Sequence, residues 1–171
     1  MSYAEQAQHA ERRVVLRHPG SAQYIQIVYR APSCRHPDFA PLFVLDAALS
    51  GAKSPSFSNG TLIYPSARLY RALVETQLAS SARSHYYPTF DPRLFELRAT
   101  VQDGHPLADV EAALVTEVDK IQQNGISAME LTNAPKQICA QMAYAGERVA
   151  SQAWLLGMWE MLDSFTRKKT L

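Results

Sequence analysis

The chain has 171 residues, 47% of them hydrophobic, which is enough for one globular domain with a sizeable core. Its 17 basic and 16 acidic side chains nearly cancel, so the overall charge does not predict binding to nucleic acid or to an anionic membrane. No run of about 18 apolar residues occurs, so no membrane span is expected, and residues 1–10 lack the apolar segment of a secretion signal. We therefore treat residues 1–171 as a single domain, with residues 1–10 as a lead-in or linker.

The first part of the chain predicts two strands and a helix. Residues 13–17 alternate as a short strand should, and residues 22–31 are rich in β-branched and aromatic side chains, so an antiparallel pair is expected. A helix should start near Asp38, because a proline and an acidic residue suit the first turn. Residues 39–49 are apolar almost all round, which predicts burial on most sides.

Residues 51–64 contain Gly, Ser, Pro and Asn without a periodic pattern. A loop of this length inside a compact domain is more often functional or mobile than idle. We expect this loop to be a candidate contact with a partner or a peptide.

The stretch 65–80 has the pattern of an amphipathic helix that starts at a proline. Apolar positions three and four residues apart predict a core-facing stripe, which consists of Leu69, Ala72, Leu73 and Thr76. The wetter side is expected to carry Arg68, Arg71 and Glu75.

The second half predicts a hairpin followed by helices. Residues 82–88 and 94–101 read as its strands, and the buried side is expected to consist of Phe95, Leu97, Ala99 and Val101. A helix should run from residue 104 to Asn124. The spacing of Ser127 and Glu130 is that of a capping box, which predicts the start of another helix there. An apolar face at residues 154–162 ends the pattern. This order predicts an α+β domain of two layers, an antiparallel sheet with helices packed on one face.

No local motif for hydrolytic chemistry is present. A zinc peptidase needs HExxH or HxxEH, and the histidines are His9, His18, His36, His85 and His105, no two closer than nine residues. A site assembled from distant histidines stays open as an alternative. Cys139 is expected to be a buried thiol in a helix, and neither a G-x-S-x-G elbow nor a phosphate-binding loop occurs.

Several segments, taken in order, resemble the C-terminal, non-catalytic domain of pitrilysin or insulinase type zinc metallopeptidases, the inverted zincins that include the mitochondrial processing peptidases. These segments are Tyr29-Arg30-Ala31-Pro32, His36-Pro37-Asp38 with Val44-Leu45-Asp46, Ser66-Ala67-Arg68-Leu69-Tyr70, Phe90-Asp91-Pro92 with Leu94-Phe95, and Gly125-Ile126-Ser127 with Glu130-Leu131. The resemblance covers roughly residues 12–165.

The resemblance implies a place in a larger enzyme. Two halves of such a peptidase close as a clamshell chamber around a peptide, and the HxxEH zinc site lies in one domain only. This chain is then expected to be an inactive wall domain, a fragment of a longer polypeptide. It would hold no cofactor of its own, zinc being in the catalytic half, and its partners would be that half and peptide substrates. Two alternatives are a non-proteolytic interaction or core-type module, and a hydrolase that acts alone. The compartment, periplasmic or cytoplasmic, stays open.

The resemblance also implies contact residues. The family often brings an arginine and a tyrosine, seven residues apart, from a non-catalytic domain toward the substrate. Here these positions fall at Val74 and at Ser80 or Ser81, so the sequence departs from the pattern. The nearby candidates for substrate or partner contact are Arg71, Arg83 and Tyr86. A purely structural role for these three is the alternative.

Overall fold

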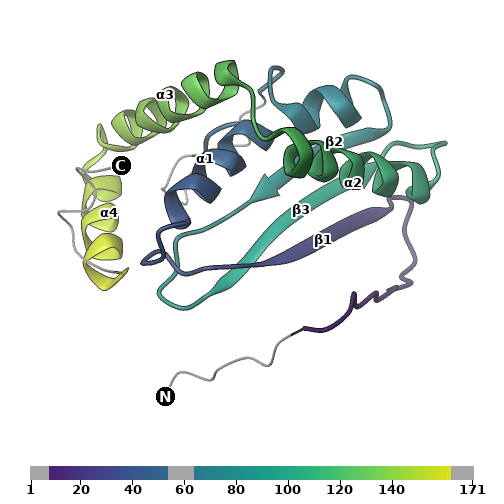
Figure 1. Cartoon of the computed structure of the whole chain (residues 1–171), viewed down its shortest axis with the longest axis horizontal. Helices are drawn as coiled ribbons and strands as arrows, with labels where there is room; N and C mark the ends of the chain where they lie inside the picture. Colours follow the sequence, from purple (N-terminus) through teal and green to yellow (C-terminus); the bar gives the residue numbers. More distant parts are fainter. Residues whose placement is uncertain (1–7, 54–63, 163–171) are drawn as a thin grey trace.

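The computed structural model describes residues 8–53 and 64–162. Its elements, in chain order, are β1 (Tyr24–Ala31), α1 (Phe39–Ser50), the π-helix η1 (Tyr70–Val74), β2 (Ala79–His85), β3 (Arg93–Val101), α2 (Leu107–Asn124), α3 (Ala128–Ala145) and α4 (Val149–Leu162) (Figure 1). The strands form one antiparallel sheet in the order β1-β3-β2, with β3 in the centre. The predicted α+β class is confirmed.

The predicted strand at residues 13–17 is wrong. These residues have no regular structure, and β1 pairs with β3 instead of with them. Arg13 forms an ion pair with Glu111 on α2, and Leu16 is 89% exposed. Apolar and polar residues do alternate in this segment, but neither set of side chains is buried against the core. Because burial of one face is what fixes the register of a strand, no strand forms there.

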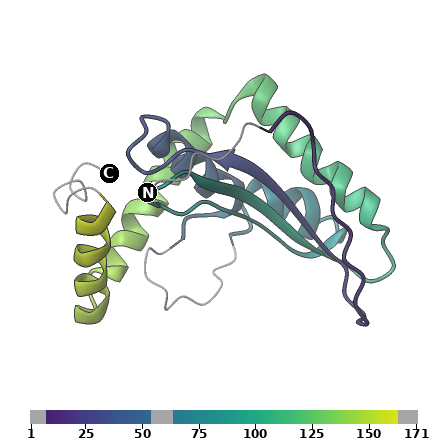
Figure 2. The ribbon, with the colours of Figure 1, turned by 90° about the horizontal axis from the view of Figure 1, so that it is seen from below.

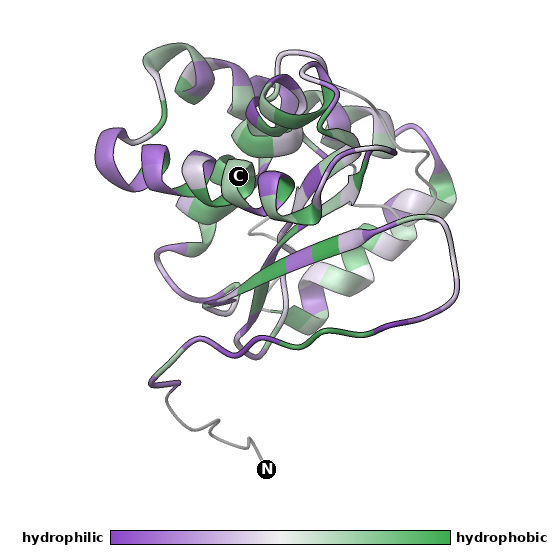
Figure 3. Ribbon diagram, turned by 90° about the vertical axis from the view of Figure 1, so that its right-hand side faces the viewer, coloured by the Kyte–Doolittle hydropathy of each residue, from purple (hydrophilic) through white to green (hydrophobic). Residues whose placement is uncertain are grey.

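The helices cover one face of the sheet. Helices α1 and η1 pack on β2, while α2 packs on β1 and β3 and runs along one side of the strands (Figure 2). Hydrophobic and hydrophilic residues alternate along the strands, as expected for a sheet with one buried face (Figure 3). The predicted buried side of β3 is confirmed, and the side chains with no exposed surface include Leu69, Leu73, Leu97, Val110 and Leu114.

The predicted helix over residues 65–80 is too long. Helical structure spans only residues 68–74, and Glu75 donates its N–H to the carbonyl of Tyr70, five residues back. Gln77 then has a φ of 61°, which ends the helical path, and β2 starts at Ala79. Leu69 and Leu73 are buried as predicted, whereas Thr76 is exposed because the helix has already ended.

The last two helices extend the helical layer. The predicted capping box is confirmed: the Glu130 N–H donates to Ser127 Oγ at 3.2 Å, and the Ser127 N–H donates to a Glu130 carboxylate oxygen at 2.7 Å. Helix α3 packs on α1, and α4 buries Leu155, Trp159 and Leu162. None of the helices in the described ranges is long and apolar enough to cross a bilayer.

Candidate functional site

The face of the sheet opposite the helices is the first candidate surface. The strand register places eleven residues on it, all exposed or half-buried, and we call them the open face: Tyr24, Gln26, Val28 and Arg30 of β1, Leu94, Glu96, Arg98 and Thr100 of β3, and Ser81, Arg83 and His85 of β2. Most of these side chains are polar or charged. The open face can therefore make hydrogen bonds and ion pairs with whatever lies against it.

Charges on the open face are arranged around Glu96. Its carboxylate accepts hydrogen bonds from Arg98 on the same strand and from Gln26 on β1, the latter at 3.3 Å. His85 lies directly across from Glu96, and its ring contacts that of Tyr87, with centroids 4.7 Å apart. Burial lowers the pKa of His85, so its imidazole is neutral at pH 7.

The structure separates the three predicted contact residues. Arg71 is exposed on η1, in the helical layer, whereas Arg83 is exposed on the open face. Tyr86 is 2% exposed and donates its hydroxyl hydrogen to the Pro32 carbonyl at 2.7 Å. Burial raises the pKa of Tyr86 to about 12. The residues therefore do not form one cluster, and Tyr86 has the contacts of a core residue.

The positions where the family pattern would place its arginine and tyrosine lie on different surfaces. Val74 is half-buried at the end of η1, and Ser80 is exposed near the start of β2. Ser81 is on the open face, where its hydroxyl donates to Thr100 Oγ1 at 3.1 Å.

A buried polar cluster joins α1 to β2, and sequence reasoning missed it. Asp46 is 3% exposed; its carboxylate accepts from Lys53 Nζ at 2.7 Å and from Ser84 Oγ at 2.6 Å. The hydroxyls of Ser50 and Ser84 are 2.9 Å apart. A serine beside a carboxylate and a lysine suggests nucleophilic chemistry, but Ser84 has no exposed surface and no substrate can reach it. The cluster therefore serves to hold the two elements together.

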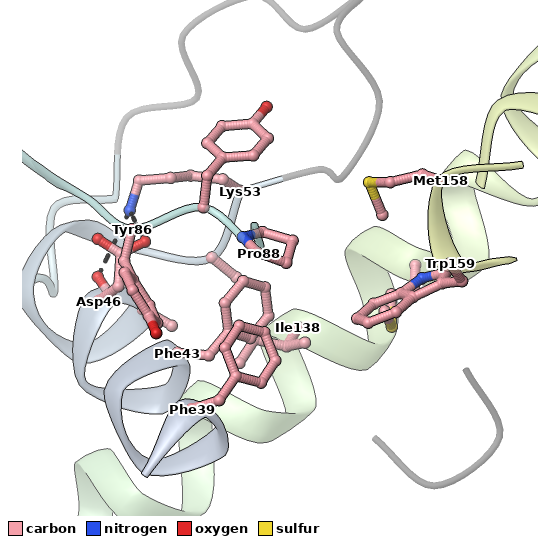
Figure 4. A pocket seen from close by; sticks show the side chains of 13 residues that line it. Phe39, Phe43, Asp46, Lys53, Tyr86, Pro88, Ile138, Met158 and Trp159 are labelled. Carbon is pink, nitrogen blue, oxygen red and sulfur yellow. Dashed lines mark hydrogen bonds and ion pairs between the residues drawn. The ribbon is translucent and has the colours of Figure 1, made fainter. Parts of the chain in front are cut away.

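A small apolar pocket lies next to this cluster, between α1, α3 and α4 (Figure 4). Phe39, Phe43 and Ile138 form one side, and Met158 and Trp159 form the other. The cavity volume is about 30 Å³, which is on the order of a few water molecules. The indole N–H of Trp159 makes no hydrogen bond to any residue in the described ranges. The pocket is too small to hold a peptide segment.

The predicted contact loop is anchored at both ends. The backbone of Gly51 has a φ of 85°, and a Cβ there would lie 2.0 Å from the ring of Tyr64, so the two ends of the loop touch. Tyr64 accepts a hydrogen bond from Gln141 on α3 at 3.0 Å, and Lys53 is held by Asp46. Residues 54–63, the centre of this loop, lie outside the described residues.

One ion pair connects two of the segments that carried the family resemblance. The guanidinium of Arg68 donates to both carboxylate oxygens of Glu130, with a distance of 2.6 Å from Nη2 to Oε2. These bonds and those from Ser127 lower the pKa of Glu130 to about 2. Arg68 was expected on the wetter side of its helix, but its side chain is only 19% exposed. The expectation is wrong because the helix has a second neighbour, the start of α3.

The described residues do not fit a zinc site. No group of three or more His, Cys, Asp or Glu side chains in residues 8–53 and 64–162 is placed to hold a metal ion. Cys34 is buried, whereas Cys139 is exposed on α3, so the predicted burial of Cys139 is wrong. We assign no ligand role to either thiol.

Comparisons with known proteins agree with this geometry. A family model described as "Peptidase M16 inactive domain" matches residues 2–138. No curated protein matches the sequence.

Solved structures show the same fold. A candidate zinc protease from Bordetella pertussis Tohama I superposes with a TM-score of 0.68 at 22% identity, covering 84% of this chain and 72% of that one. The inactive peptidase domain of a candidate zinc protease from Bordetella parapertussis gives 0.69 at 22% identity, covering 89% and 76%. A protease from Helicobacter pylori gives 0.73 at 20% identity, and the match covers 86% of this chain but 33% of that protein.

Proposed function

This chain belongs to the peptidase M16 inactive domain family, and from that premise we propose that it forms one wall of a chamber that holds peptides for a zinc peptidase. The observation that carries the proposal is the family match over residues 2–138. A second observation supports it: the sheet has a helical layer on one face and a polar, accessible surface on the other.

The accessibility of the two faces of the sheet indicates where a peptide would bind. The helical side of the sheet buries the core and leaves no room for a peptide, whereas the open face is broad and exposed. We therefore place the peptide against the open face. Among the three predicted contact residues, this favours Arg83 as the peptide contact, with Tyr86 supporting the wall from beneath and Arg71 on the helical layer.

Peptide-bond cleavage is assigned to a catalytic half that carries HxxEH, either on the same polypeptide or in a separate subunit. The described residues of this chain include no set of side chains placed to bind zinc, so we assign them no step of the reaction. Their contribution is to bind the peptide and restrict its orientation, which lowers the entropic part of the barrier. They also limit the access of bulk water to the site.

Cleavage of an unfolded fluorogenic peptide tests the proposal. The chain alone should leave the peptide uncut, and the HxxEH-bearing half alone should cut it slowly. Mixing the two should raise the rate by one or more orders of magnitude, because correct positioning of a substrate contributes factors of this size.

The same assay distinguishes the alternatives. Failure of the mixture to gain activity, although the two proteins bind each other, would identify a non-proteolytic interaction module. Cleavage by the isolated chain that resists chelators would identify a hydrolase that acts alone. Either outcome would overturn the chamber-wall proposal.

A further inference from the structure

The outer edge of strand β1 has main-chain groups available for another strand. The Val101 N–H donates to the Gln23 carbonyl at 2.9 Å, so these two residues form a hydrogen-bonded pair of the ladder between β1 and β3. Such pairs alternate along antiparallel strands, so the N–H and C=O groups of Tyr24, Gln26 and Val28 point away from β3. In the described part of the chain, no backbone group bonds to them. This edge can therefore accept a further strand.

The edge lacks the features that usually prevent a free strand from pairing. Residues 24–29 read Tyr-Ile-Gln-Ile-Val-Tyr, without a charge, a proline or a glycine, and their register with β3 is continuous. The opposite edge strand, β2, has a register shift between Ala79 and Ser81. Free edges are commonly short, charged, bulged or broken by proline, because an uncovered edge pairs with other chains. The sequence of β1 is therefore that of a strand covered on both sides.

A separate segment follows this edge without pairing with it. Residues 11–17 run beside β1 in the opposite direction (Figures 1 and 2). The ion pair between Arg13 and Glu111 holds the segment to α2. Burial and nearby carboxylates, that of Glu11 among them, raise the pKa of Tyr29, so Glu11 lies near the far end of β1. No backbone hydrogen bond joins residues 11–17 to the described residues of β1. The segment thus borders the edge and leaves its main chain unpaired.

Apolar side chains on both sides of this edge are exposed. In the bordering segment, Val14, Val15 and Leu16 are 80%, 73% and 89% exposed. On β1, Tyr29 is 40% exposed although its side chain lies on the covered side of the sheet. Removing such surfaces from water is favourable. A strand with apolar residues at alternate positions would pair with the edge and also bury these side chains.

We propose that the outer edge of β1 binds one extended strand of the polypeptide that carries the HxxEH half, and that this strand lies between β1 and residues 11–17. The inference rests on the proposed function for the presence of that half, and it adds a docking site for it. Main-chain hydrogen bonds would supply the affinity, and apolar side chains at alternate positions of the strand would supply the specificity.

The observations favour a strand of the catalytic half over a substrate peptide. A substrate leaves after cleavage and would expose the edge in every cycle, whereas an edge without charge, proline or bulge needs lasting cover. The match to the Helicobacter pylori protease covers only 33% of that protein, so there the same fold is accompanied by a larger amount of polypeptide. A lasting partner of this kind suits the edge.

Hydrogen exchange of single amides, followed by NMR, tests the inference on the full 171-residue chain with and without the HxxEH-bearing half. The amides of Tyr24, Gln26 and Val28 should exchange rapidly in the chain alone and about tenfold or more slowly in the complex. Alternate amides within residues 13–17 should slow as well. The amides of Ile25 and Ile27 point toward β3 and are the matched control, because they should exchange slowly in both samples.

A proline substitution provides a second test. Val28→Pro should keep the fold, because the Val28 N–H points outward and takes no part in the ladder with β3. It should weaken binding of the HxxEH-bearing half about tenfold or more, since it removes a donor and its ring obstructs the next strand. Val28→Ala keeps the donor and should change binding by about twofold or less. Circular dichroism would verify both folds, and the exchange measurement on the unaltered chain needs neither variant.

Rapid exchange of the outward amides, or of residues 13–17, in a complex that has formed would overturn the inference. Protection that appears in the chain alone and grows with its concentration would assign the edge to a second copy. Protection by a substrate peptide alone would assign it to the substrate, and either result would overturn the inference too.

The cleavage assay separates these failures from failure of the proposed function. Restored cleavage in a complex whose outward amides stay unprotected would remove the docking strand alone. Protected amides without restored cleavage would remove the chamber-wall role and leave β1 as a docking edge for that polypeptide.

Discussion

The two faces of the same three strands have opposite properties. On the covered face, Leu97 and Ala99 of β3 lie beneath the helices and belong to the main core, whereas Arg98, between them in sequence, lies on the open face. Along one strand, residues that stabilise the core therefore alternate with residues that are available for surface contacts. The difference teaches that stability and function of this domain should respond to different substitutions, even at adjacent positions.

The largest expected effect is on the covered face. Leu97→Ala should lower the free energy of unfolding by about 2–5 kcal/mol, because it removes a side chain with no exposed surface from the centre of the sheet. Leu73→Ala on η1 should cost a similar amount. Urea denaturation would measure both, with Arg71→Ala as the exposed control. If Leu97→Ala lowered the free energy of unfolding by less than 1 kcal/mol, the covered face would not be the main source of stability.

A smaller effect is expected at the base of the loop on the helical side. Gly51→Ala should cost about 1–3 kcal/mol, because its backbone conformation is one that residues with a Cβ rarely adopt and the Cβ would clash with the Tyr64 ring. Gly20→Ala is the matched control, since a Cβ there meets nothing within 4 Å. Equal costs at both glycines in thermal denaturation would contradict the contact between the loop ends.

The ion pair between Arg68, just before η1, and Glu130 on α3 should make stability depend on pH. The pKa of Glu130 is about 2 in the folded chain and about 4.5 ordinarily, so its contribution is complete above pH 4.5 and disappears as pH falls toward 2. Glu130→Gln should therefore cost about 1 kcal/mol at pH 7, and less at pH 3. Denaturation at both pH values would show it. A difference between wild type and variant that does not change with pH would contradict the account.

The smallest effect is expected on the open face. Arg83→Ala should change stability by less than about 0.5 kcal/mol, because Arg83 is exposed and substitutions of exposed residues rarely have a larger effect. Calorimetry of the variant would measure this. A loss above 1 kcal/mol would show that Arg83 is part of the structural framework, and the two faces would then differ less than we argue.

How far the sequence predicted the fold depended on whether local pattern and packing agreed. Strand β3 and helix α2 were predicted well because their apolar periodicity matches a covered face, and α1 was predicted from an apolar run that needs burial on most sides. The strand at residues 13–17 and the length of the helix before β2 were predicted wrongly. Arg13 forms an ion pair with Glu111 on α2, and the positive φ of Gln77 turns the chain into β2. Neither feature has a signature in the local sequence.

The candidate site was less predictable than the fold. Arg83 was singled out by its place near a family pattern, but only the register with Arg98 shows that it belongs to a charged surface. The buried cluster of Asp46, Lys53 and Ser84 joins residues 38 positions apart. Its one sequence signal was a lone carboxylate in an otherwise apolar helix, and such a residue needs a partner when it is buried.

The most direct test of the central claim asks which face meets the peptide. A photo-crosslinking amino acid would replace Val28, 46% exposed on the open face, or Val115, 39% exposed on α2, in the complex with the HxxEH-bearing half. A labelled peptide should crosslink to the Val28 variant and not to the Val115 variant, and an excess of unlabelled peptide should abolish the signal. Equal crosslinking at both positions, or crosslinking at Val115 alone, would contradict the claim that the open face is the peptide-facing wall.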